Sequence, residues 1–256
     1  MTQPEIKVLP DPAAVAAEAA ERVVRSADEA IALAGRFSFV LAGGSTPKAL
    51  YELLASDAYR DRVDWAKVEI YFGDERTVPP DHKDSNYRMA RETLLAKVPI
   101  PGDNVYRMRG EIDPQEAAKE YGLMLKEKFP AITSGQVQNG ETWGGADLLL
   151  LGMGEDGHTA SLFPGTPALR ETKHRVVANP VPQLNTTRLT MTAPFLNRSR
   201  TVILTVTGAS KAQRLAEVLE GPRDPERLPV QLIAPASGKM TWLIDATAAE
   251  MTDSDH

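Results

Sequence analysis

The chain has 256 residues and a mass of 27.9 kDa, and its 42% hydrophobic and 25% charged residues are typical of a globular protein with a substantial core. A formal net charge of −6 and a pI near 5.4 disfavour nonspecific binding to nucleic acid, whose phosphates would be repelled. Cysteine is absent, which excludes disulfides, thiolate nucleophiles and thiolate-bound structural zinc.

The sequence shows no pattern expected of an amino-terminal secretion signal or a membrane span. The amino terminus lacks a basic start, an apolar core and a cleavage site, and no later run approaches ~18 apolar residues. We therefore expect a cytoplasmic protein with neither a membrane nor a nucleic-acid partner. Residues 13–34 carry apolar positions at helical spacing, which predicts a long amphipathic helix opened by Asp11 and Pro12. We expect one α/β domain over residues 1–249 and a disordered polar tail over 250–256.

Strand and helix patterns alternate along the rest of the chain. In order, we expect strand 37–42, helix 47–55, strand 68–72, helix 85–97, a short strand near 105–108, helix 114–129, strand 147–151, short strands near 175–178 and 188–192, strand 201–207, helix 211–219 and strand 240–244. Strands separated by such helices imply parallel crossovers, hence a layered, Rossmann-like, mostly parallel α/β sheet flanked by helices, with room for a small β subdomain. The polar, glycine-bearing segment 133–145 reads as a flexible loop.

The most informative pattern is the segment LLLLGMGEDGHTASLFP, residues 148–164. Its unbroken apolar run predicts a strand buried on both faces, and the loop after such a strand is where open α/β sheets bind ligands. Three glycines in that loop let Glu155, Asp156 and His158 be presented on a tight turn. Among the four histidines only His158 has such a setting, so it is the candidate catalytic base. The alternative is a polar surface loop in which Asp156 only caps its own backbone.

The segment LAGGSTPKAL, residues 41–50, again leads from a strand into a helix. Backbone donors at the helix start, the helix dipole and two hydroxyls suit a phosphate, while Pro47 suits the first helical position and the hydroxyls can also cap. Capping alone is the competing interpretation, and the loop is not a Walker motif. The candidate ligands here are Gly43, Gly44, Ser45 and Thr46.

The segment TVTGASKAQRL, residues 205–215, places Ser210 and Gln213 in a capping-box pattern. Lys211 then lies on the first helical turn, where a cation is unfavourable unless an anion is near. Lys211 is therefore a candidate phosphate ligand, and a solvent-exposed lysine is the alternative.

A fourth loop follows the strand at 68–72 and reads GDERTVPPDHKDSNYRMA. Asp74 and Arg76 at a strand end can orient a base and bind an anion, respectively, although such a pair is commonly only a solvated surface contact.

Four motifs, taken together and in this order, resemble those of the 6-phosphogluconolactonases, which share a fold with glucosamine-6-phosphate deaminases. The motifs are GGSTP, GDER with SNYRM, GMGEDGHTASLFP and GASKA. The similarity spans about residues 6–244. It implies hydrolysis of 6-phospho-D-glucono-1,5-lactone in the oxidative pentose phosphate pathway without a metal or cofactor. It also implies that His158 is the base, that Gly43 to Thr46 and Lys211 hold the phosphate, and that Asp74 faces the substrate. Arg76 belongs to the lactonase form of its motif. Asn86 and Arg88 are further candidate substrate-binding residues whose roles stay open.

Lactone hydrolysis needs a base for water, donors for the developing oxyanion and a proton for the leaving ring oxygen. An imidazole can take the proton from water and return it to the leaving alkoxide, so no covalent intermediate is needed. Asp156 or Glu155 is expected to fix the tautomer of His158. Arg76 or backbone donors of the glycine loop are expected to face the oxyanion.

Two other functions remain open. One is a glucosamine-6-phosphate deaminase and isomerase, against which stand the Thr-Ala-Ser-Leu-Phe-Pro sequence after His158 and the Gly-Asp-Glu-Arg motif. The other is a non-catalytic sugar-phosphate sensor, although only about 35 residues precede the first expected strand. We expect a small-molecule ligand and a monomer or weak homo-oligomer.

Overall fold

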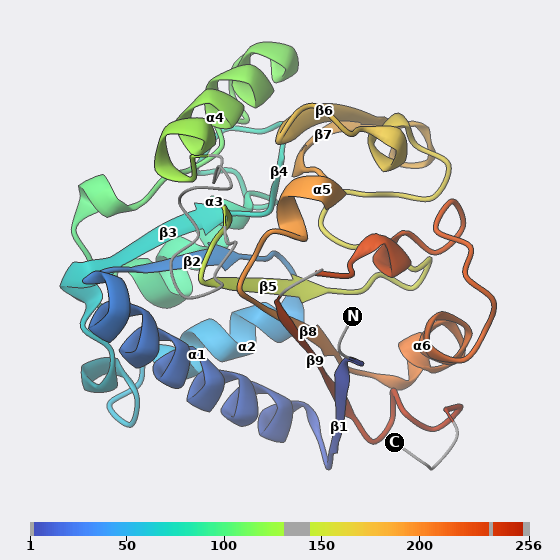
Figure 1. Ribbon diagram of the computed structural model, residues 1–256, viewed down its shortest axis with the longest axis horizontal. Helices are drawn as coiled ribbons and strands as arrows, with labels where there is room; N and C mark the ends of the chain where they lie inside the picture. Colours follow the sequence, from blue (N-terminus) through green and yellow to red (C-terminus); the bar gives the residue numbers. More distant parts are fainter. Residues whose placement is uncertain (1–2, 131–143, 236–237, 253–256) are drawn as a thin grey trace, which may run out of the picture.

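A computed structural model describes residues 3–130, 144–235 and 238–252 of the chain, and its centre is a parallel sheet (Figure 1). Six strands pair in the order β1-β9-β8-β5-β2-β3, and every neighbouring pair is parallel. The strands are β1 (Glu5–Leu9), β2 (Phe37–Leu41), β3 (Val68–Phe72), β5 (Leu148–Gly152), β8 (Thr201–Val206) and β9 (Lys239–Asp245). The expected Rossmann-like, mostly parallel sheet is confirmed.

A second, antiparallel sheet of three strands pairs in the order β4-β7-β6. It consists of β4 (Asp74–Arg76), β6 (Val176–Val181) and β7 (Thr186–Met191). Strand β4 follows β3 after the single residue Gly73, so the small sheet begins at the carboxyl end of the large one.

Helices cover both faces of the parallel sheet. The α-helices are α1 (Pro12–Ala34), α2 (Ser45–Leu54), α3 (Asn86–Ala90), α4 (Pro114–Lys128), α5 (Ala193–Leu196) and α6 (Ala212–Leu219). A π-helical turn, Arg91–Leu95, continues α3. Short 3₁₀ turns lie at Arg60–Arg62, Trp65–Lys67, Gly102–Asn104, Pro167–Arg170, Pro182–Leu184, Ala209–Lys211 and Pro229–Leu232. None of the helices in the described residues is long and apolar enough to cross a membrane.

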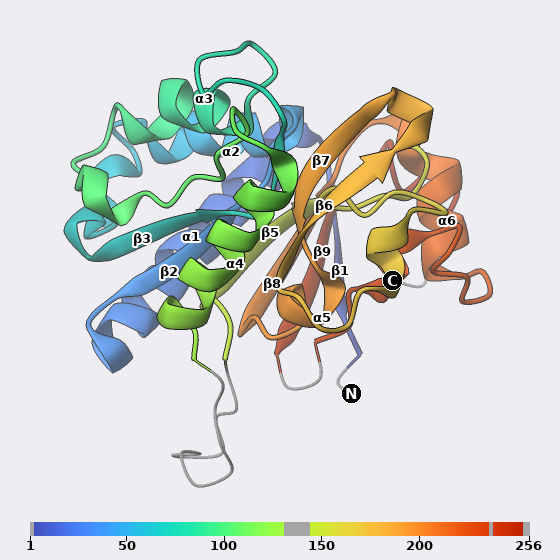
Figure 2. The ribbon, with the colours of Figure 1, turned by 90° about the horizontal axis from the view of Figure 1, so that it is seen from above.

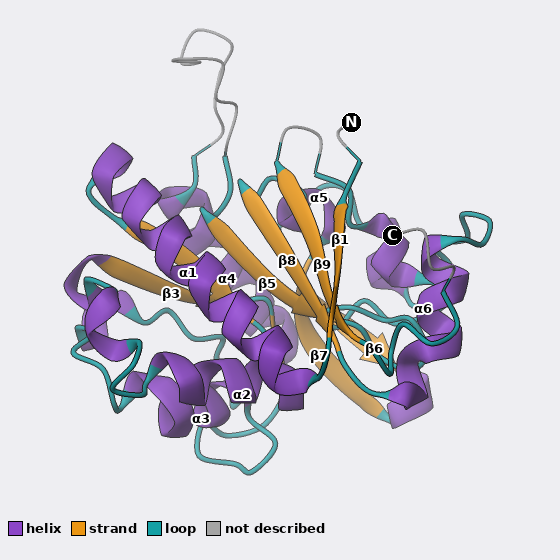
Figure 3. Ribbon diagram, turned by 90° about the horizontal axis from the view of Figure 1, so that it is seen from below, coloured by secondary structure: helices purple, strands orange, loops and turns teal. Residues whose placement is uncertain are grey.

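The core has two layers because successive strand residues point to opposite faces. In β2, Phe37, Phe39 and Leu41 pack with α1 and α2 on one face, while Val40 packs on the other. The second face is covered by α4, α6 and the small sheet. Helix α4 and the small sheet lie toward the viewer in Figure 2, whereas α1 and α2 lie across the opposite face in Figure 3. The strands are thus buried on both sides, as the continuous apolar run of β5 predicts.

Helix α1 begins as its sequence predicts. The carboxylate of Asp11 accepts a hydrogen bond from the amide of Ala14 at 2.8 Å, and Pro12 takes the first helical position. The helix ends at Gly35, whose φ of 73° is the left-handed conformation in which glycine is least strained.

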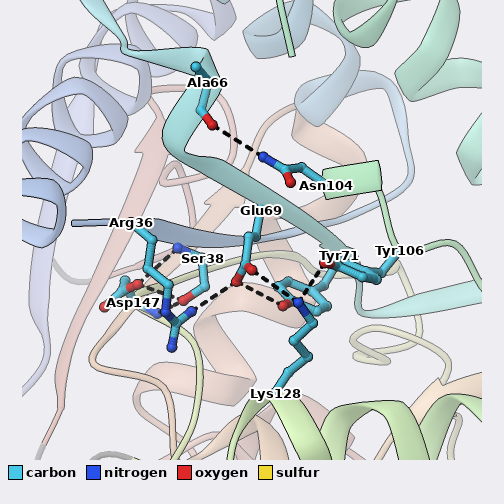
Figure 4. A network of polar contacts seen from close by, with 9 residues as sticks. All are labelled: Arg36, Ser38, Ala66, Glu69, Tyr71, Asn104, Tyr106, Lys128 and Asp147. Carbon is cyan, nitrogen blue, oxygen red and sulfur yellow. Dashed lines mark hydrogen bonds and ion pairs between the residues drawn. The ribbon is translucent and has the colours of Figure 1, made fainter. Parts of the chain in front are cut away.

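A polar network ties the amino ends of the strands together, at the edge opposite the loops described below (Figure 4). The carboxylate of Asp147 accepts hydrogen bonds from the amide and hydroxyl of Ser38 at 2.8 and 2.6 Å, which joins β5 to β2. Lys128 of α4 contacts Glu69 of β3 at 3.2 Å and the hydroxyl of Tyr106 at 2.6 Å. These contacts account for the charged groups at this edge without a ligand.

Several expected elements differ from the structure. No strand forms over 105–108: Val105 makes one bridge to Ile70, and the Tyr121 hydroxyl then donates to the carbonyl of Tyr106, so a side chain takes the place of a neighbouring strand. Strands β1 and β4 were not expected, since one is a short edge strand and the other has three residues. Helix α2 begins two residues early, so Pro47 is its third residue and not its first.

The remaining elements lie within a few residues of the expected bounds, except that β6 and β7 are each six residues long. Of the predicted loop at 133–145 only Gly144 and Gly145 fall within the described residues. Of the predicted tail at 250–256 only residues 250–252 do so.

Candidate active site

A cavity of about 550 Å³ lies at the carboxyl edge of the parallel sheet. The loops after β2, β3, β5 and β8 form its walls together with residues of β7. It brings together four motifs that are far apart in the sequence, as expected for loops that follow parallel strands. The predicted residues in its walls are Gly43, Gly44, Ser45, Thr46, Asp74, Arg76, Asn86, Glu155, Asp156, His158 and Lys211.

His158 is held against Asp156 in the loop after β5. Its Nδ1 atom lies 2.5 Å from Oδ1 of Asp156, and the same oxygen accepts the backbone amide of His158 at 3.1 Å. Asp156 therefore caps the backbone and also holds the ring, so both interpretations of this residue apply at once. Burial raises the pKa of Asp156, but the hydrogen bond and positive charge of His158 outweigh burial and lower that pKa overall. Because Nδ1 faces the carboxylate, Nε2 is the nitrogen left for a reactant.

The glycines of this loop are needed for that geometry. A Cβ atom on Gly154 would lie 2.0 Å from Nδ1 of His158 and 2.7 Å from Oδ1 of Asp156. Gly157 has a φ of 84°, which strains other residues. The ring of Phe163 stacks on the imidazole with centroids 4.2 Å apart. The imidazole is thus held by Asp156 at its Nδ1 edge and by Phe163 on one face, yet 30% of its side chain stays exposed.

The start of α2 presents backbone donors to the cavity. Gly44 is the N-cap residue with a φ of 108°, and no side chain caps this helix. Ser45 and Thr46 therefore do not cap, contrary to expectation, because they lie inside the first turn. The hydroxyl of Thr46 instead lies 2.7 Å from that of Thr207 after β8. An uncapped first turn leaves amide hydrogens for an anion.

Lys211 reaches the cavity from the loop after β8. It ends the 3₁₀ turn Ala209–Lys211 and is the N-cap residue of α6, with no side-chain cap, so the expected capping box of Ser210 and Gln213 is wrong. Burial lowers the pKa of Lys211, and the nearby charges of Glu155 and Asp156 oppose that shift. This partly buried ammonium differs from the freely solvated lysine of the alternative interpretation.

Asp74 is buried at the opposite flank, with 8% of its surface exposed. Its Oδ2 accepts the hydroxyl of Ser161 at 2.6 Å, and its Oδ1 accepts the side-chain amide of Asn86 at 3.2 Å. The interpretation of Asp74 as part of a solvated surface pair is therefore wrong. Asn86 also occupies the space beside Gly43, where a Cβ would lie 2.1 Å from its Oδ1. Asn86 thus positions Asp74 and the loop at Gly43.

Glu75 is more deeply buried and faces protein donors. Its carboxylate accepts the amides of Arg76, Asn86 and Tyr87 at 2.7 to 2.8 Å, and burial raises its pKa. These bonds fix β4 to the start of α3, which makes the role of Glu75 structural.

The chain is similar to known proteins over the region that contains these motifs. The family model described as glucosamine-6-phosphate isomerases/6-phosphogluconolactonase matches residues 10–242. The chain belongs to this family of enzymes. A 6-phosphogluconolactonase of Synechocystis is 41% identical over 249 residues, which cover 96% of this chain and 98% of that protein. One from Nostoc is 39% identical, covering 95% of this chain and 96% of its own.

Solved structures of the family have the same fold. The 6-phosphogluconolactonase from Trypanosoma brucei is 30% identical, has a TM-score of 0.81 and matches 98% of this chain and 99% of its own. A monomeric glucosamine-6-phosphate deaminase has a TM-score of 0.79 at 20% identity over 96% of this chain and 99% of its own, a similarity that shows the fold alone.

Arg88 is not placed as expected, and of the two carboxylates expected beside His158 the structure has Asp156 on the ring. Arg88 does not line the cavity: its guanidinium binds Glu92 at 2.7 Å and the carbonyl of Asp81 at 2.9 Å on an exposed face. Glu155 lines the cavity, but Asp156 is the carboxylate on the imidazole.

Other cavity residues were missed from the sequence. Ser161 and Phe163 lie within the quoted histidine motif, but nothing in the motif shows that one binds Asp74 and the other stacks on His158. Thr207 and Arg188 also line the cavity. Arg188 carried no local signal, because its place depends on the pairing of β7 with β4.

Among the described residues, no group of three or more His, Asp or Glu side chains is arranged to hold a metal ion. A larger cavity of about 930 Å³ lies between α4 and β6, and its described walls include none of the candidate site residues.

Proposed function

We propose that this enzyme hydrolyses 6-phospho-D-glucono-1,5-lactone to 6-phosphogluconate, the second step of the oxidative pentose phosphate pathway. The observation that carries the proposal is the fixed His158–Asp156 pair in one cavity with an uncapped helix start and a partly buried lysine. The names of the family relatives support the same reaction.

The phosphate binds first, as a handle remote from the reacting carbon. The amides of Ser45 and Thr46, the positive end of α2 and the ammonium of Lys211 supply donors and charge for it. Binding energy from this end holds the lactone so that its carbonyl carbon meets a water molecule in a reactive geometry.

His158 then acts as the general base through Nε2. As the water oxygen bonds to the carbonyl carbon, the water proton moves to the imidazole, and Asp156 stabilises the resulting imidazolium across 2.5 Å. The carbonyl oxygen becomes an oxyanion, for which Arg76 supplies positive charge from the cavity wall.

Collapse of this intermediate breaks the bond between the carbonyl carbon and the ring oxygen. The imidazolium returns its proton to that oxygen, which becomes a hydroxyl, and the new carboxylic acid loses its proton to solvent. The base is thereby regenerated and no covalent enzyme intermediate forms.

The test is acid release from freshly generated lactone at constant pH, with no protein, this protein and its His158→Ala variant. Removal of the base is expected to lower kcat by roughly 10² to 10⁴ fold. His174→Ala is a matched control, because His174 also pairs with a carboxylate, Glu171, at 3.1 Å but is 71% exposed and outside this cavity.

Three other outcomes are informative. Acceleration that survives His158→Ala keeps the reaction but assigns the base elsewhere. No acceleration by folded protein, together with ammonia release from glucosamine 6-phosphate, establishes the deaminase alternative. Tight sugar-phosphate binding without any turnover establishes the sensor.

The enzyme is proposed to act in the cytoplasm as a monomer or weak homo-oligomer, with the phosphosugar lactone as its only partner. The localisation is to be tested directly, since some rice relatives are named chloroplastic.

A further inference from the structure

Arg188 lies directly opposite Arg76 in the small sheet. Strands β4 and β7 are antiparallel, and their register pairs Arg76 with Arg188. Residues paired in this way project from the same face of a sheet, and like charges at such positions repel. Both side chains line the cavity. Two adjacent cations on one wall are stable only if something of opposite charge compensates for them.

The described residues compensate the charge of Arg188 only through carboxylates that form no hydrogen bond or ion pair with it. Among the described side chains, Nε of Arg188 is the one buried nitrogen or oxygen atom without a hydrogen-bond partner. No described residue forms an ion pair with Arg188. Burial and, next, the charge of Arg76 lower the pKa of its guanidinium, while the charges of Asp74, Glu75 and Asp84 oppose the shift.

The nearby carboxylates are engaged elsewhere. Asp74 accepts hydrogen bonds from Ser161 and Asn86, and Glu75 accepts three backbone amides. The planar guanidinium of Arg188 therefore retains its donors, a group suited to binding a carboxylate through two parallel hydrogen bonds.

The order of the strands places Lys211 and the two arginines on opposite sides of the His158 loop. Along the carboxyl edge the sequence of strands is β8, β5, β2, β3, so the loop of His158 lies between Lys211 on one flank and Arg76 on the other. Helix α2 follows β2 and lies between these flanks, so Lys211 marks the flank away from the arginines. If the phosphate lies on the side of Lys211, the carbonyl carbon attacked at His158 points toward the two arginines.

We propose that Arg188 and Arg76, here called the arginine pair, bind the carboxylate of the product and the oxyanion that precedes it. This inference rests on the proposed function. The lactone carbonyl is uncharged before attack, so the pair interacts more strongly with the transition state than with the substrate. Arg188 is thus a catalytic residue as well as a determinant of product affinity.

The test compares two ligands that share a phosphate and differ at the other end. 6-Phosphogluconate carries a carboxylate where glucitol 6-phosphate carries a neutral hydroxymethyl group. Binding of each is measured by calorimetry to the wild type and to the Arg188→Met and Lys211→Ala variants. Methionine keeps much of the apolar stem of arginine, and the thermal midpoint of each ligand-free variant checks that it is folded.

We expect the wild type to prefer 6-phosphogluconate by roughly 10- to 100-fold, the range for a hydrogen-bonded charge. Arg188→Met abolishes this preference without weakening glucitol 6-phosphate. Lys211→Ala weakens both ligands by the same factor. For the lactone, Arg188→Met lowers kcat more than it raises KM. Its thermal midpoint without ligand is no lower than that of the wild type, because a like-charge pair is removed.

Equal weakening of both ligands by Arg188→Met would overturn the inference by making Arg188 a phosphate ligand. A preference that survives the substitution, or a large fall in the thermal midpoint, would overturn it too. Each of these three outcomes leaves the proposed function standing if the wild type hydrolyses the lactone. If the wild type neither hydrolyses the lactone nor binds either ligand, the proposed function fails and the inference fails with it.

Discussion

Replacing Asp156 by asparagine tests whether the contact at Nδ1 of His158 matters for catalysis. Asparagine keeps the size of the side chain and an oxygen for the backbone amide of His158, but it removes the negative charge 2.5 Å from the ring. The imidazolium that forms in the proposed mechanism then loses its stabilising partner. The substitution therefore acts on the transition state and leaves the phosphate site intact.

The size of the effect follows from the exposure of the pair. A hydrogen bond to a charged group is worth about 1.5–3 kcal/mol, and partial exposure moves a contact toward the low end because solvent screens it. The side chains of His158 and Asp156 are 30% and 43% exposed. We therefore expect a loss near the lower bound, about 1.5–2 kcal/mol, which corresponds to a fall in kcat of roughly 10- to 30-fold.

The assay is acid release from the lactone at constant pH, with kcat and KM measured separately. Glu155→Gln is the matched control, because it removes a neighbouring carboxylate that also lines the cavity but is not the one on the ring. An Asp156→Asn enzyme with the wild-type kcat, or a Glu155→Gln enzyme impaired to the same extent, would refute the reasoning.

Three further predictions use other parts of the structure. Lys211→Ala should raise KM for the lactone roughly 10- to 100-fold with little change in kcat, and steady-state kinetics that show a fall in kcat alone would contradict this. Gly154→Ala should abolish most activity in a protein whose circular dichroism spectrum is unchanged, because its Cβ would lie 2.0 Å from Nδ1 of His158. The side-chain hydrogen bond from Arg62 lowers the pKa of Glu21 to about 2 from an ordinary value of 4.5, so this contact stabilises the fold above pH 4.5 and is lost as the pH falls toward 2. Glu21→Gln should accordingly lower the thermal midpoint at pH 7 but not at pH 2, and equal shifts at both pH values would argue against it.

The sequence predicts well the strands and loops that a local residue pattern determines. An apolar run precedes both Gly152 and the Gly-Gly-Ser-Thr turn, and each run predicts a buried strand followed by a loop. Because the strands are parallel, the two loops lie at the same edge of the sheet. His158 and Lys211 are found in the cavity for this reason.

Other features depend on geometry that a motif does not carry. Asn86 and Arg88 belong to one motif, but residues two apart on a helix are rotated by roughly 200°, so one faces the cavity and the other the solvent. The capping box at Ser210 fails because a 3₁₀ turn precedes α6. Arg188 enters the site only through the pairing of distant strands.

The distribution of hydrogen-bonding capacity explains how an acidic protein can bind an anionic ligand. Of the carboxylates that line the cavity, those of Asp74 and Asp156 are occupied by protein donors, which reduces the acceptor capacity that faces an anion. The cations of the cavity have few protein partners. No described residue accepts a hydrogen bond from the side chains of Lys211 and Arg188, and the side chain of Arg76 donates to the carbonyl of Asp84 alone. Since burial has already removed part of the water from these cations, an anion that replaces it meets a smaller desolvation cost than it would at a surface lysine. We therefore infer that the proposed selectivity for anions comes from the charges that the fold leaves unpaired, and that it is independent of the net charge of −6.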